Sequence, residues 1–436
     1  MKFGGTSVAD AAAFENVARI VAAQRNASPV VVVSAMSGVT DSLLAATTIA
    51  SLEGTFRRHE AAARELLTHA KAEEFVEHVN NAAQRIAQLL EALSAEPTRK
   101  ATQDSIVAFG ETLSSALLAE VLNERGVAAR QVDARRCIIT NDDYTCAAPL
   151  MAETFSHSQQ ELRPFLETGV VPVLGGFIGA TLSGATTTLG RGGSDYTAAI
   201  IGAALSASEI QIWTDVTGVL TADPRVVPEA QTIERLSYSE AAELAYFGAK
   251  VLHPKTIQPA IESSIPVRIC NSRAPEERGT LVGPETETSP RTVKAIAHKS
   301  GVTTVQITSA RMLGAYGFLR ALFEVFEKHR TVVDVVTTSE VSVSLSLDDA
   351  ERLPEIVQEL EVLGTVRVEK GRAIVCVVGE GLRGTPGIAG KVFSTISDIN
   401  VSLISQGASS INFTFAVEEA RVNEAVRRLH EEFFSH

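Results

Sequence analysis

The stretch Gly190-Arg191-Gly192-Gly193-Ser194-Asp195 combines three glycines with an arginine, a serine and an aspartate. It follows a β-prone run at 185–189 and precedes an alanine- and isoleucine-rich run at 196–205 that has helical character. Glycines let a backbone approach an anion closely, and a helix N-terminus directs free N–H groups towards it. The stretch therefore predicts an anion-binding turn between a strand and a helix. An ordinary turn with a serine or aspartate N-cap is the alternative.

The bulk composition excludes several classes of protein. A chain of 436 residues is long enough for two or three domains, and 45% hydrophobic with 21% charged residues is ordinary for a globular protein. The formal net charge of -13 argues against a nucleic-acid partner, and no apolar run reaches the roughly 20 residues of a membrane span. The four cysteines are scattered without a CxxC pair, and no secretory signal opens the sequence. We therefore expect a reduced, cytoplasmic protein.

Polar residues and glycines follow other expected strands as well. The sequence begins with Lys-Phe-Gly-Gly-Thr-Ser at 2–7, a short strand at 29–33 leads into small hydroxyl residues and glycine at 34–41, and the strand at 210–215 ends in Thr-Asp. The alternation of such strands with helical patterns predicts a mostly parallel sheet with helices on both faces. In open α/β sheets of this kind, ligands bind at the carboxyl ends of the strands.

One carboxylate stands in an otherwise apolar helical stretch. We expect a pair of amphipathic helices at 53–96 and a further helix from about 102 to 125, and Glu111 lies among small and apolar residues of the latter. An unpaired buried charge is costly. Glu111 is therefore expected to be paired or functional, unless it occupies a plain surface position.

The last third of the chain contains an internal repeat. Gly317 matches Gly387 at a shift of 70 residues, and the segment 342–345 matches 410–413 at a shift of 68. Each copy has a glycine-led helix and an alternating strand, so we expect two similar α/β modules of about 70 residues. The Pro-, Glu-, Thr- and Gly-rich stretch at 279–292 is expected to be the linker that precedes them.

Four motifs occur in order along the chain and together resemble those of one family. Besides the opening stretch they are Lys2-Phe3-Gly4-Gly5-Thr6-Ser7, Trp213-Thr214-Asp215-Val216 and Lys250-Val251-Leu252-His253-Pro254. This set resembles the aspartate kinases, which have the amino-acid kinase fold. The C-terminal repeat is similar to the tandem ACT domains of that family. The resemblance covers nearly the whole chain and is most like the lysine-inhibited type.

The resemblance implies an α/β fold with a mostly parallel central sheet and helices on both faces, followed by two ferredoxin-like ACT domains. The implied catalytic domain covers 1–285, with an aspartate lobe at about 1–180 and a nucleotide lobe at 181–285. The implied regulatory region covers 286–436, with ACT domains at about 305–375 and 376–436, the second completed by a strand near 295–307.

The implied reaction transfers the ATP γ-phosphoryl group to the side-chain carboxylate of L-aspartate and gives 4-phospho-L-aspartate. Mg²⁺ would be carried by ATP rather than by a protein metal site, and the product would enter lysine, threonine and methionine synthesis. Two alternatives stay open. One is the kinase portion of a bifunctional enzyme fused to homoserine dehydrogenase or diaminopimelate decarboxylase, and the other is a catalytically silent amino-acid sensor.

The resemblance also implies roles for individual residues. The catalytic positions are Lys2 and Asp195. The phosphate-binding positions are Gly4, Gly5, Thr6, Gly192 and Gly193. The aspartate-binding positions are Ser34, Thr40, Glu111, Arg191 and Ser194. The ATP-binding positions are Thr214, Asp215, Arg225 and Lys250. Chemically, the fork of an arginine suits the α-carboxylate of the substrate, and a glutamate suits its ammonium group.

The first ACT copy resembles a lysine-sensing one. The implied effector-binding positions are Met312, Phe318, Leu319, Val333, Asp334, Thr338, Ser339 and Glu340. Ala315 stands where a serine is usual, so threonine is the alternative effector. Because ACT modules usually pair side by side, the resemblance implies a homodimer or a dimer of dimers through these domains. A plain role in a hinge or in dimer contacts is the alternative for these residues.

Overall fold

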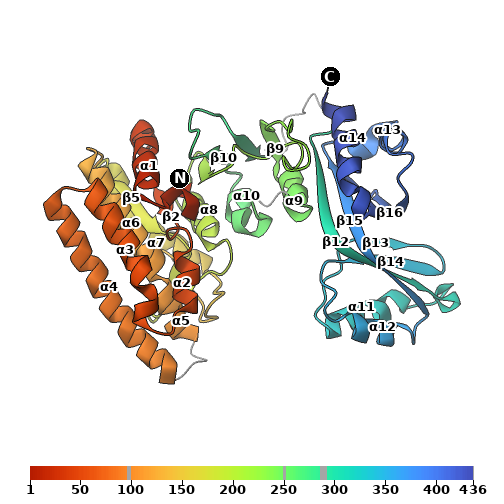
Figure 1. The fold of residues 1–436 in the computed structure, drawn as a ribbon, viewed down its shortest axis with the longest axis horizontal. Coiled ribbons are helices and arrows are strands. Elements are labelled where there is room, and N and C mark those ends of the chain that lie inside the picture. The colour runs from red at the N-terminus through yellow and green to blue at the C-terminus, as the bar shows by residue number, and fades with distance from the viewer. Residues whose placement is uncertain (96–99, 249–251, 285–291, 436) are drawn as a thin grey trace. The chain divides into compact units, whose positions relative to one another are not determined.

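The computed structural model describes residues 1–95, 100–248, 252–284 and 292–435 (Figure 1). Its contacts divide the chain into two compact units that interleave in sequence. The first unit comprises Met1–Val219, Glu234–Tyr238 and Leu252–Pro284. The second comprises Leu220–Ile233, Ser239–Val251 and Glu285–His436.

In the described residues, the first unit is built around an eight-stranded sheet with the order β3-β5-β2-β1-β8-β10-β11-β9. The strands are β1 (Lys2–Phe3), β2 (Val31–Val33), β3 (Ala129–Val132), β5 (Val171–Gly175), β8 (Ile210–Thr214), β9 (Arg235–Ser237), β10 (Val267–Asn271) and β11 (Thr280–Gly283). Neighbouring strands from β3 to β10 are parallel, and β11 is antiparallel to β10. The predicted mostly parallel sheet is confirmed.

Helices cover both faces of this sheet. Alternate residues of each strand point to opposite sides, so apolar strands present a hydrophobic surface on both faces. Val31, Val33 and Val173 face one core, and Val132 and Leu174 face another. The first core is closed by α1 (Ala11–Ala23), α3 (Glu53–Leu66), α4 (His69–Ala95) and α6 (Phe109–Glu124). The second is closed by α7 (Met151–Glu167) and α8 (Gly193–Ala204). Besides short 3-10 helices, the unit has α2 (Val39–Ala45), α5 (Lys100–Val107), α10 (Gln258–Glu262) and a small sheet of β4 (Ile139–Thr140), β6 (Ile178–Thr181) and β7 (Thr186–Thr188).

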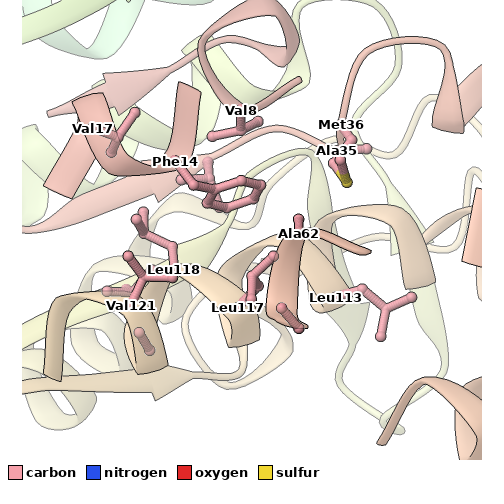
Figure 2. Close-up of a cluster of buried hydrophobic side chains, with 14 of the residues drawn as sticks. Val8, Phe14, Val17, Ala35, Met36, Ala62, Leu113, Leu117, Leu118 and Val121 are labelled. Carbon is pink, nitrogen blue, oxygen red and sulfur yellow. The ribbon is translucent and has the colours of Figure 1, made fainter. Parts of the chain in front are cut away.

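The first core fixes helix α6 against α1 and the strands. Phe14 of α1 and Leu117 of α6 have no exposed surface, and Figure 2 shows them pointing towards each other beside Leu118 and Val121. Burying a large side chain of this kind contributes about 1.5–3 kcal/mol. Ala35 and Met36, which follow β2, belong to the same cluster. This packing therefore anchors the loop after β2 to helix α6.

Two sequence-based expectations are wrong in detail. The single helix expected at 102–125 is interrupted at Ala108, which separates α5 from α6. The linker expected at 279–292 contains strand β11, whose alternate residues Thr280 and Val282 are fully buried between β10 and β9. The residues 285–291 lie outside the described part of the chain. For β11, the pairing with β10 and β9 decided the local structure rather than the composition of the segment.

A single helical stretch among the described residues, Lys100–Glu124, is long and apolar enough to cross a membrane by length and composition. It spans α5 and α6, and 72% of its apolar window is buried inside the protein. A core helix of a globular protein has the same character. The burial within the protein explains the apolar composition without a membrane.

The described residues of the second unit form a six-stranded sheet with the order β13-β14-β12-β15-β17-β16. The strands are β12 (Ala295–Thr308), β13 (Val336–Thr338), β14 (Ser342–Leu347), β15 (Thr365–Val378), β16 (Val401–Gln406) and β17 (Asn412–Glu418), all in antiparallel pairs. The helices are α11 (Phe318–Lys328), α12 (Leu353–Leu360), α13 (Ile388–Thr395) and α14 (Val422–Phe434), with most of α9 (Tyr238–Tyr246).

The predicted internal repeat is confirmed within this unit. Gly317 precedes α11 with φ 82°, and Gly387 precedes α13 with φ 85°, a left-handed conformation that favours glycine. Each copy then continues into a strand pair, β13–β14 or β16–β17. The long strands β12 and β15 run through both copies, as Figure 1 shows. The two modules therefore share their central strands.

Candidate active site

A cavity of about 980 Å³ lies at the carboxyl ends of the central strands of the first unit. Gly4 follows β1, Ser34 follows β2 and Asp215 follows β8, and all three line the cavity. Lys2 pairs in register with Val32 on one side and with Ile212 on the other, so the three strands end at one level. The chain leaves β1 towards β2 and returns later to β8. Such a change of direction is where open α/β sheets bind ligands.

Lys2 and Asp195 form an ion pair inside this cavity. Lys2 Nζ lies 2.7 Å from Asp195 Oδ1, and the two side chains are 11% and 19% exposed. Lys2 comes from the central strand and Asp195 from the first turn of α8, so the pair joins two rigid elements. A Cβ added at Gly4 would lie 3.5 Å from Lys2 Nζ, which places the Gly4 backbone beside the ammonium group. The cavity thus contains an ammonium group that an ion pair fixes next to partly buried backbone.

The glycine-rich turn has the predicted strand–turn–helix form. It joins β7 to α8, and Gly190 and Gly192 have φ values of 73° and 75°. A Cβ added at Gly193 would lie 2.7 Å from the ring of Phe177, so only glycine fits. Because α8 begins at Gly193, its free N–H groups lie at the edge of the cavity. Arg191 lines the cavity from the same turn.

Glu111 is a buried carboxylate in the wall of the cavity. The residue is 3% exposed, and its Oε2 atom has no hydrogen-bond partner among the described residues. Burial raises the pKa of Glu111 to about 8, although backbone N–H groups of Ala35 and of Glu111 itself bond the carboxylate. The alternative of a plain surface position is wrong. A buried carboxylate with a free oxygen is suited to bind a cation from the cavity.

The structure brings most of the predicted substrate-binding residues together. The catalytic and phosphate-binding positions that line the cavity are Lys2, Gly4, Gly5, Thr6, Gly192, Gly193 and Asp195. The other predicted positions that line it are Ser34, Thr40, Glu111, Arg191, Ser194, Thr214 and Asp215. Their individual roles stay predictions.

Two predicted ATP-binding residues are not placed in this cavity. Arg225 belongs to the second unit, where its Nη2 lies 2.6 Å from Asp223 Oδ2 and its side chain is 87% exposed. Lys250 lies outside the described residues. The nucleotide-binding roles of both residues stay predictions.

Sequence reasoning missed part of the cavity wall. The additional lining residues include Lys100, Gln103, Asp104, Thr145, Phe177 and Thr188. Asp104 is 2% exposed and accepts hydrogen bonds from two other segments of the chain. The available signal was a second carboxylate in the same apolar helical stretch as Glu111.

The predicted effector residues lie in the first repeat module of the second unit. The Asp334 side chain is 2% exposed and accepts a hydrogen bond from the Tyr246 hydroxyl group, while its other oxygen lies 3.5 Å from Lys299 Nζ. Lys299 also pairs with Asp348. Burial and the neighbouring Asp348 carboxylate raise the pKa of Asp334. Asp334 is therefore a buried acidic group whose Oδ1 is hydrogen-bonded and whose Oδ2 has a nearby cation but no hydrogen-bond partner in the described residues.

The other effector positions surround this module on several sides. Met312, Phe318 and Val333 are partly buried against its core, and Leu319 is exposed on α11. Thr338 is the last residue of β13, and the hydroxyl groups of Ser339 and Ser342 are 2.8 Å apart. Glu340 is exposed in the same turn. Their binding roles stay predictions.

The described residues contain no group of three or more His, Cys, Asp or Glu side chains that could hold a metal ion. Asp195 and Asp215 nevertheless line the cavity. Mg²⁺ prefers octahedral oxygen coordination and commonly takes one or two carboxylates together with substrate phosphates. The residues present therefore fit a magnesium ion that arrives with a nucleotide.

Comparisons with known proteins agree with this fold. The family described as the amino acid kinase family matches residues 1–271, and an ACT domain matches residues 375–433. The fold and the site thus define an amino acid kinase with a C-terminal ACT region.

Individual relatives identify the family within the amino acid kinases to which this chain belongs. Lysine-sensitive aspartokinase 3 of Escherichia coli is 40% identical over 99% of this chain and 98% of its own length. The chloroplastic aspartokinase 3 of Arabidopsis thaliana is 41% identical over 100% of this chain and 81% of its own. The crystal structure of E. coli aspartokinase III with aspartate and ADP matches with a TM-score of 0.83 and 39% identity, covering 99% of both chains. The chain belongs to the aspartokinase family.

Proposed function

We propose that this chain transfers the γ-phosphoryl group of ATP to the side-chain carboxylate of L-aspartate and releases 4-phospho-L-aspartate. The observation that carries the proposal is the arrangement of opposite charges in one cavity. The Lys2 ammonium group, held by Asp195, and the N-terminus of α8 offer positive charge to phosphates, and the buried Glu111 in its ionised form offers negative charge to an ammonium group. The E. coli relative that binds aspartate and ADP supports this assignment.

The reaction requires positioning and charge stabilisation more than proton transfer. The side-chain carboxylate of aspartate is already ionised near neutral pH, so its attack on the γ-phosphorus needs no general base. The transferring phosphoryl group carries negative charge on its oxygens, and fixed donors that face it stabilise the transition state. Lys2 supplies such a donor, and Asp195 holds the Lys2 ammonium group in place. A magnesium ion bound with the nucleotide would add positive charge on the phosphate oxygens.

Substrate selection is assigned to groups on two different elements. Arg191, on the turn before α8, is suited to a bidentate bond with the α-carboxylate. Glu111, on α6, is suited to the α-ammonium group, which would donate a hydrogen bond to the oxygen that has no partner in the described residues. Ser34, Thr40 and Ser194 complete the polar wall. The amino-acid end of the substrate is thereby held while its side chain points to the phosphates.

Regulation by an end-product amino acid is the second half of the proposal. The ACT region and the lysine-sensitive E. coli relative support lysine as the effector, with Asp334 and Glu340 as partners for its ammonium groups. Threonine is the alternative because of Ala315. Assembly as a homodimer or a dimer of dimers through the ACT domains, and a cytoplasmic location, are further parts of the proposal.

The direct test is ATP- and Mg²⁺-dependent formation of aspartyl phosphate, trapped as the hydroxamate, with and without lysine or threonine. We expect turnover that lysine suppresses and threonine does not. Suppression by threonine alone would keep the reaction and overturn the effector. A folded protein that binds ATP but turns over no aspartate would overturn the proposed reaction and leave the amino-acid sensor.

A further inference from the structure

Asp104 is a buried carboxylate that the reaction described above does not use. It lies on α5, is 2% exposed, and lines the cavity. Its Oδ2 atom accepts hydrogen bonds from the backbone N–H groups of Thr145 at 2.9 Å and Thr188 at 3.0 Å. Its Oδ1 atom accepts one from the Thr188 hydroxyl at 2.8 Å. Burying a carboxylate carries a large desolvation cost, so this position is poorly explained by stability alone.

The three hydrogen bonds join segments that are distant in the sequence. Thr188 is the last residue of β7, immediately before the turn that carries Arg191. Thr145 belongs to the loop after β4 and has a φ of 75°, which is unusual for a residue other than glycine. Asp104 therefore fixes both the end of β7 and a loop held in an uncommon conformation.

The loop that Asp104 holds supports the glycine-rich turn directly. A Cβ added at Gly190 would lie 3.2 Å from Cys146 Sγ and 3.4 Å from the carbonyl oxygen of Thr145. Gly190 thus rests against the two loop residues, and its position depends on theirs. Arg191 is the next residue in the chain, so a shift of the loop residues Thr145 and Cys146 would also move the backbone of Arg191.

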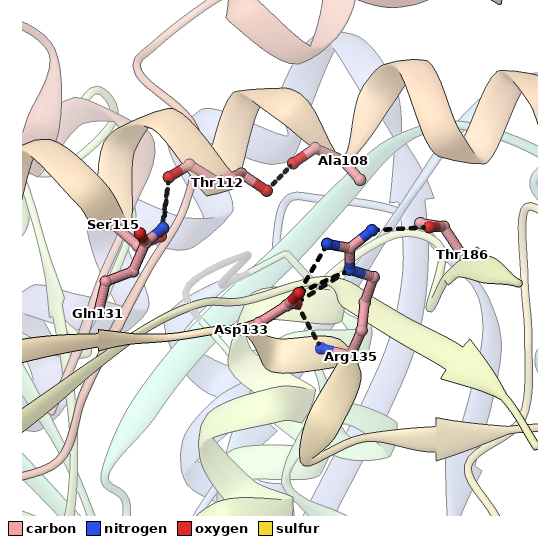
Figure 3. A network of polar contacts seen from close by, with 7 residues as sticks. All are labelled: Ala108, Thr112, Ser115, Gln131, Asp133, Arg135 and Thr186. Carbon is pink, nitrogen blue, oxygen red and sulfur yellow. Dashed lines mark hydrogen bonds and ion pairs between the residues drawn. The ribbon is translucent and has the colours of Figure 1, made fainter. Parts of the chain in front are cut away.

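Other contacts hold the rest of β7 independently of Asp104. Arg135 donates a hydrogen bond to the Thr186 hydroxyl at 3.3 Å, and Figure 3 shows Arg135 held in turn by Asp133. The hydroxyl groups of Thr187 and Thr140 are 2.7 Å apart. Loss of the Asp104 bonds should therefore release the end of the strand rather than the whole strand.

The same helical stretch carries Asp104 and Glu111. Asp104 lies on α5 and Glu111 on α6, and the break between these helices is at Ala108. One stretch of chain thus provides Glu111 itself and, through Asp104, the support of Arg191. These are the two groups to which the ammonium and the α-carboxylate of the substrate are assigned.

We propose that Asp104 is a positioning residue that sets Arg191 relative to Glu111 and so determines how tightly the enzyme holds the α-amino-acid end of its substrate. The proposal rests on the proposed function of the cavity. It assigns Asp104 no contact with the reacting atoms. Its loss should therefore weaken aspartate binding far more than ATP binding.

The test compares Asp104→Asn with wild-type protein by steady-state kinetics. The amide nitrogen of asparagine is a donor and cannot replace a carboxylate oxygen that accepts from N–H or O–H groups. We expect the KM for aspartate to rise by about tenfold or more, because small misplacements of substrate-holding groups have large effects. The KM for ATP should change by less than about twofold, since Asp104 acts on the amino-acid subsite.

A double-mutant cycle with Arg191→Ala separates positioning from general damage. If Asp104 acts through Arg191, the double variant will have nearly the same KM for aspartate as Arg191→Ala alone. Additive effects, or equal losses for ATP and aspartate together with a lowered melting temperature, would overturn the proposal.

A milder variant keeps the proposal testable if Asp104→Asn fails to fold. Thr188→Val removes the hydroxyl donor and leaves the backbone donor, so we expect a rise of about threefold in the KM for aspartate that disappears in the Arg191→Ala background. A rise that persists in that background would contradict the proposal. Wild-type protein that turns over no aspartate would instead overturn the proposed function itself.

Discussion

The cavity of the first unit and the first repeat module of the second unit each contain a buried carboxylate, and the two differ in the groups that lie beside them. Glu111 has an oxygen without a hydrogen-bond partner in the described part of the chain, and it faces the cavity. The Oδ2 atom of Asp334 also has no hydrogen-bond partner there, but it lies 3.5 Å from the Lys299 ammonium group, and Oδ1 accepts a hydrogen bond from Tyr246. The partners of the Glu111 carboxylate are backbone N–H groups, so once it is ionised it can receive an ammonium group without displacing a side chain. An ammonium group that bound Asp334 would instead have to displace Lys299 or Tyr246.

The partner of Asp334 belongs to a helix with further contacts to the same sheet. On α9, Glu240 lies 2.8 Å from Lys294, Glu243 accepts a hydrogen bond from Asn412 at 2.7 Å, and Tyr246 donates to Asp334. Residues three apart share one face of a helix. Polar contacts to the six-stranded sheet and to Lys294 just before it therefore hold this face of α9, and a ligand that displaced Tyr246 from Asp334 would loosen one end of the helix.

The largest effect is expected at the charge that faces the phosphates. Replacing Lys2 by methionine keeps the volume of the side chain and removes the ammonium group that pairs with Asp195. We expect kcat to fall by about 10²–10³-fold, as when one fixed transition-state donor is lost. Hydroxamate formation measures the rate, and calorimetry with lysine serves as the control. The affinity for lysine should be unchanged in this variant. A loss of lysine affinity as large as the loss of kcat would contradict the assignment of catalysis and effector binding to two separate sites.

Glu111→Gln tests whether the free carboxylate receives the substrate. The amide keeps the shape of the side chain and removes its negative charge, so the bond to an ammonium group weakens. We expect the KM for aspartate to rise by about 10–100-fold, the range for hydrogen bonds to charged groups, with the KM for ATP nearly constant. If aspartate affinity survives the substitution, Glu111 does not bind the ammonium group.

The pKa of Glu111 gives this comparison a pH dependence. Burial raises the pKa from 4.5 to about 8, so the folded protein binds an extra proton in that window. The stability of the free protein should fall as pH rises from 4.5 to 8, because the unfolded chain binds fewer protons there. Aspartate binding has the opposite trend, since it needs the ionised form, and affinity should rise by up to about tenfold per pH unit below pH 8. Titration calorimetry in buffers of different ionisation enthalpy should show proton release on aspartate binding.

The matched control for that pH profile is again Glu111→Gln. Without a titrating group at this position, the steep part of the aspartate affinity profile should flatten and the proton release should vanish. An unchanged profile in this variant would assign the pH dependence to another group.

The smallest effect is expected from the contact that occupies Asp334. Tyr246→Phe removes the hydroxyl donor and keeps the ring that packs against Lys299, whose Nζ is 4.7 Å from the ring centroid. Because the effector then has less to displace, we expect lysine to inhibit at a concentration lower by about 2–10-fold, which corresponds to one hydrogen bond. Glu243→Gln, on the same helix but away from Asp334, is the control. Weaker inhibition in Tyr246→Phe would mean that Tyr246 helps to bind the effector.

Much of the molecule followed from local rules in the sequence. The turn at 190–195 was predictable because glycines permit positive φ and close approach, and the structure shows both at Gly190, Gly192 and Gly193. The repeat was predictable because each copy needs a glycine before its helix. The grouping of strand ends into one cavity followed from the geometry of a parallel sheet.

Other features depended on contacts between distant residues. Asp104 has its role only because Thr145 and Thr188, 41 and 84 residues away, donate to it. The segment 280–283 has the composition of a linker, and it is a strand because β10 and β9 provide its hydrogen bonds. The sequence by itself determined the glycine turns, the alternating strands and the charged groups at strand ends, since these depend on local conformation and periodicity. Only the tertiary structure decided which carboxylates are buried and what they bond, because desolvation and hydrogen-bond partners come from segments that the chain brings together on folding.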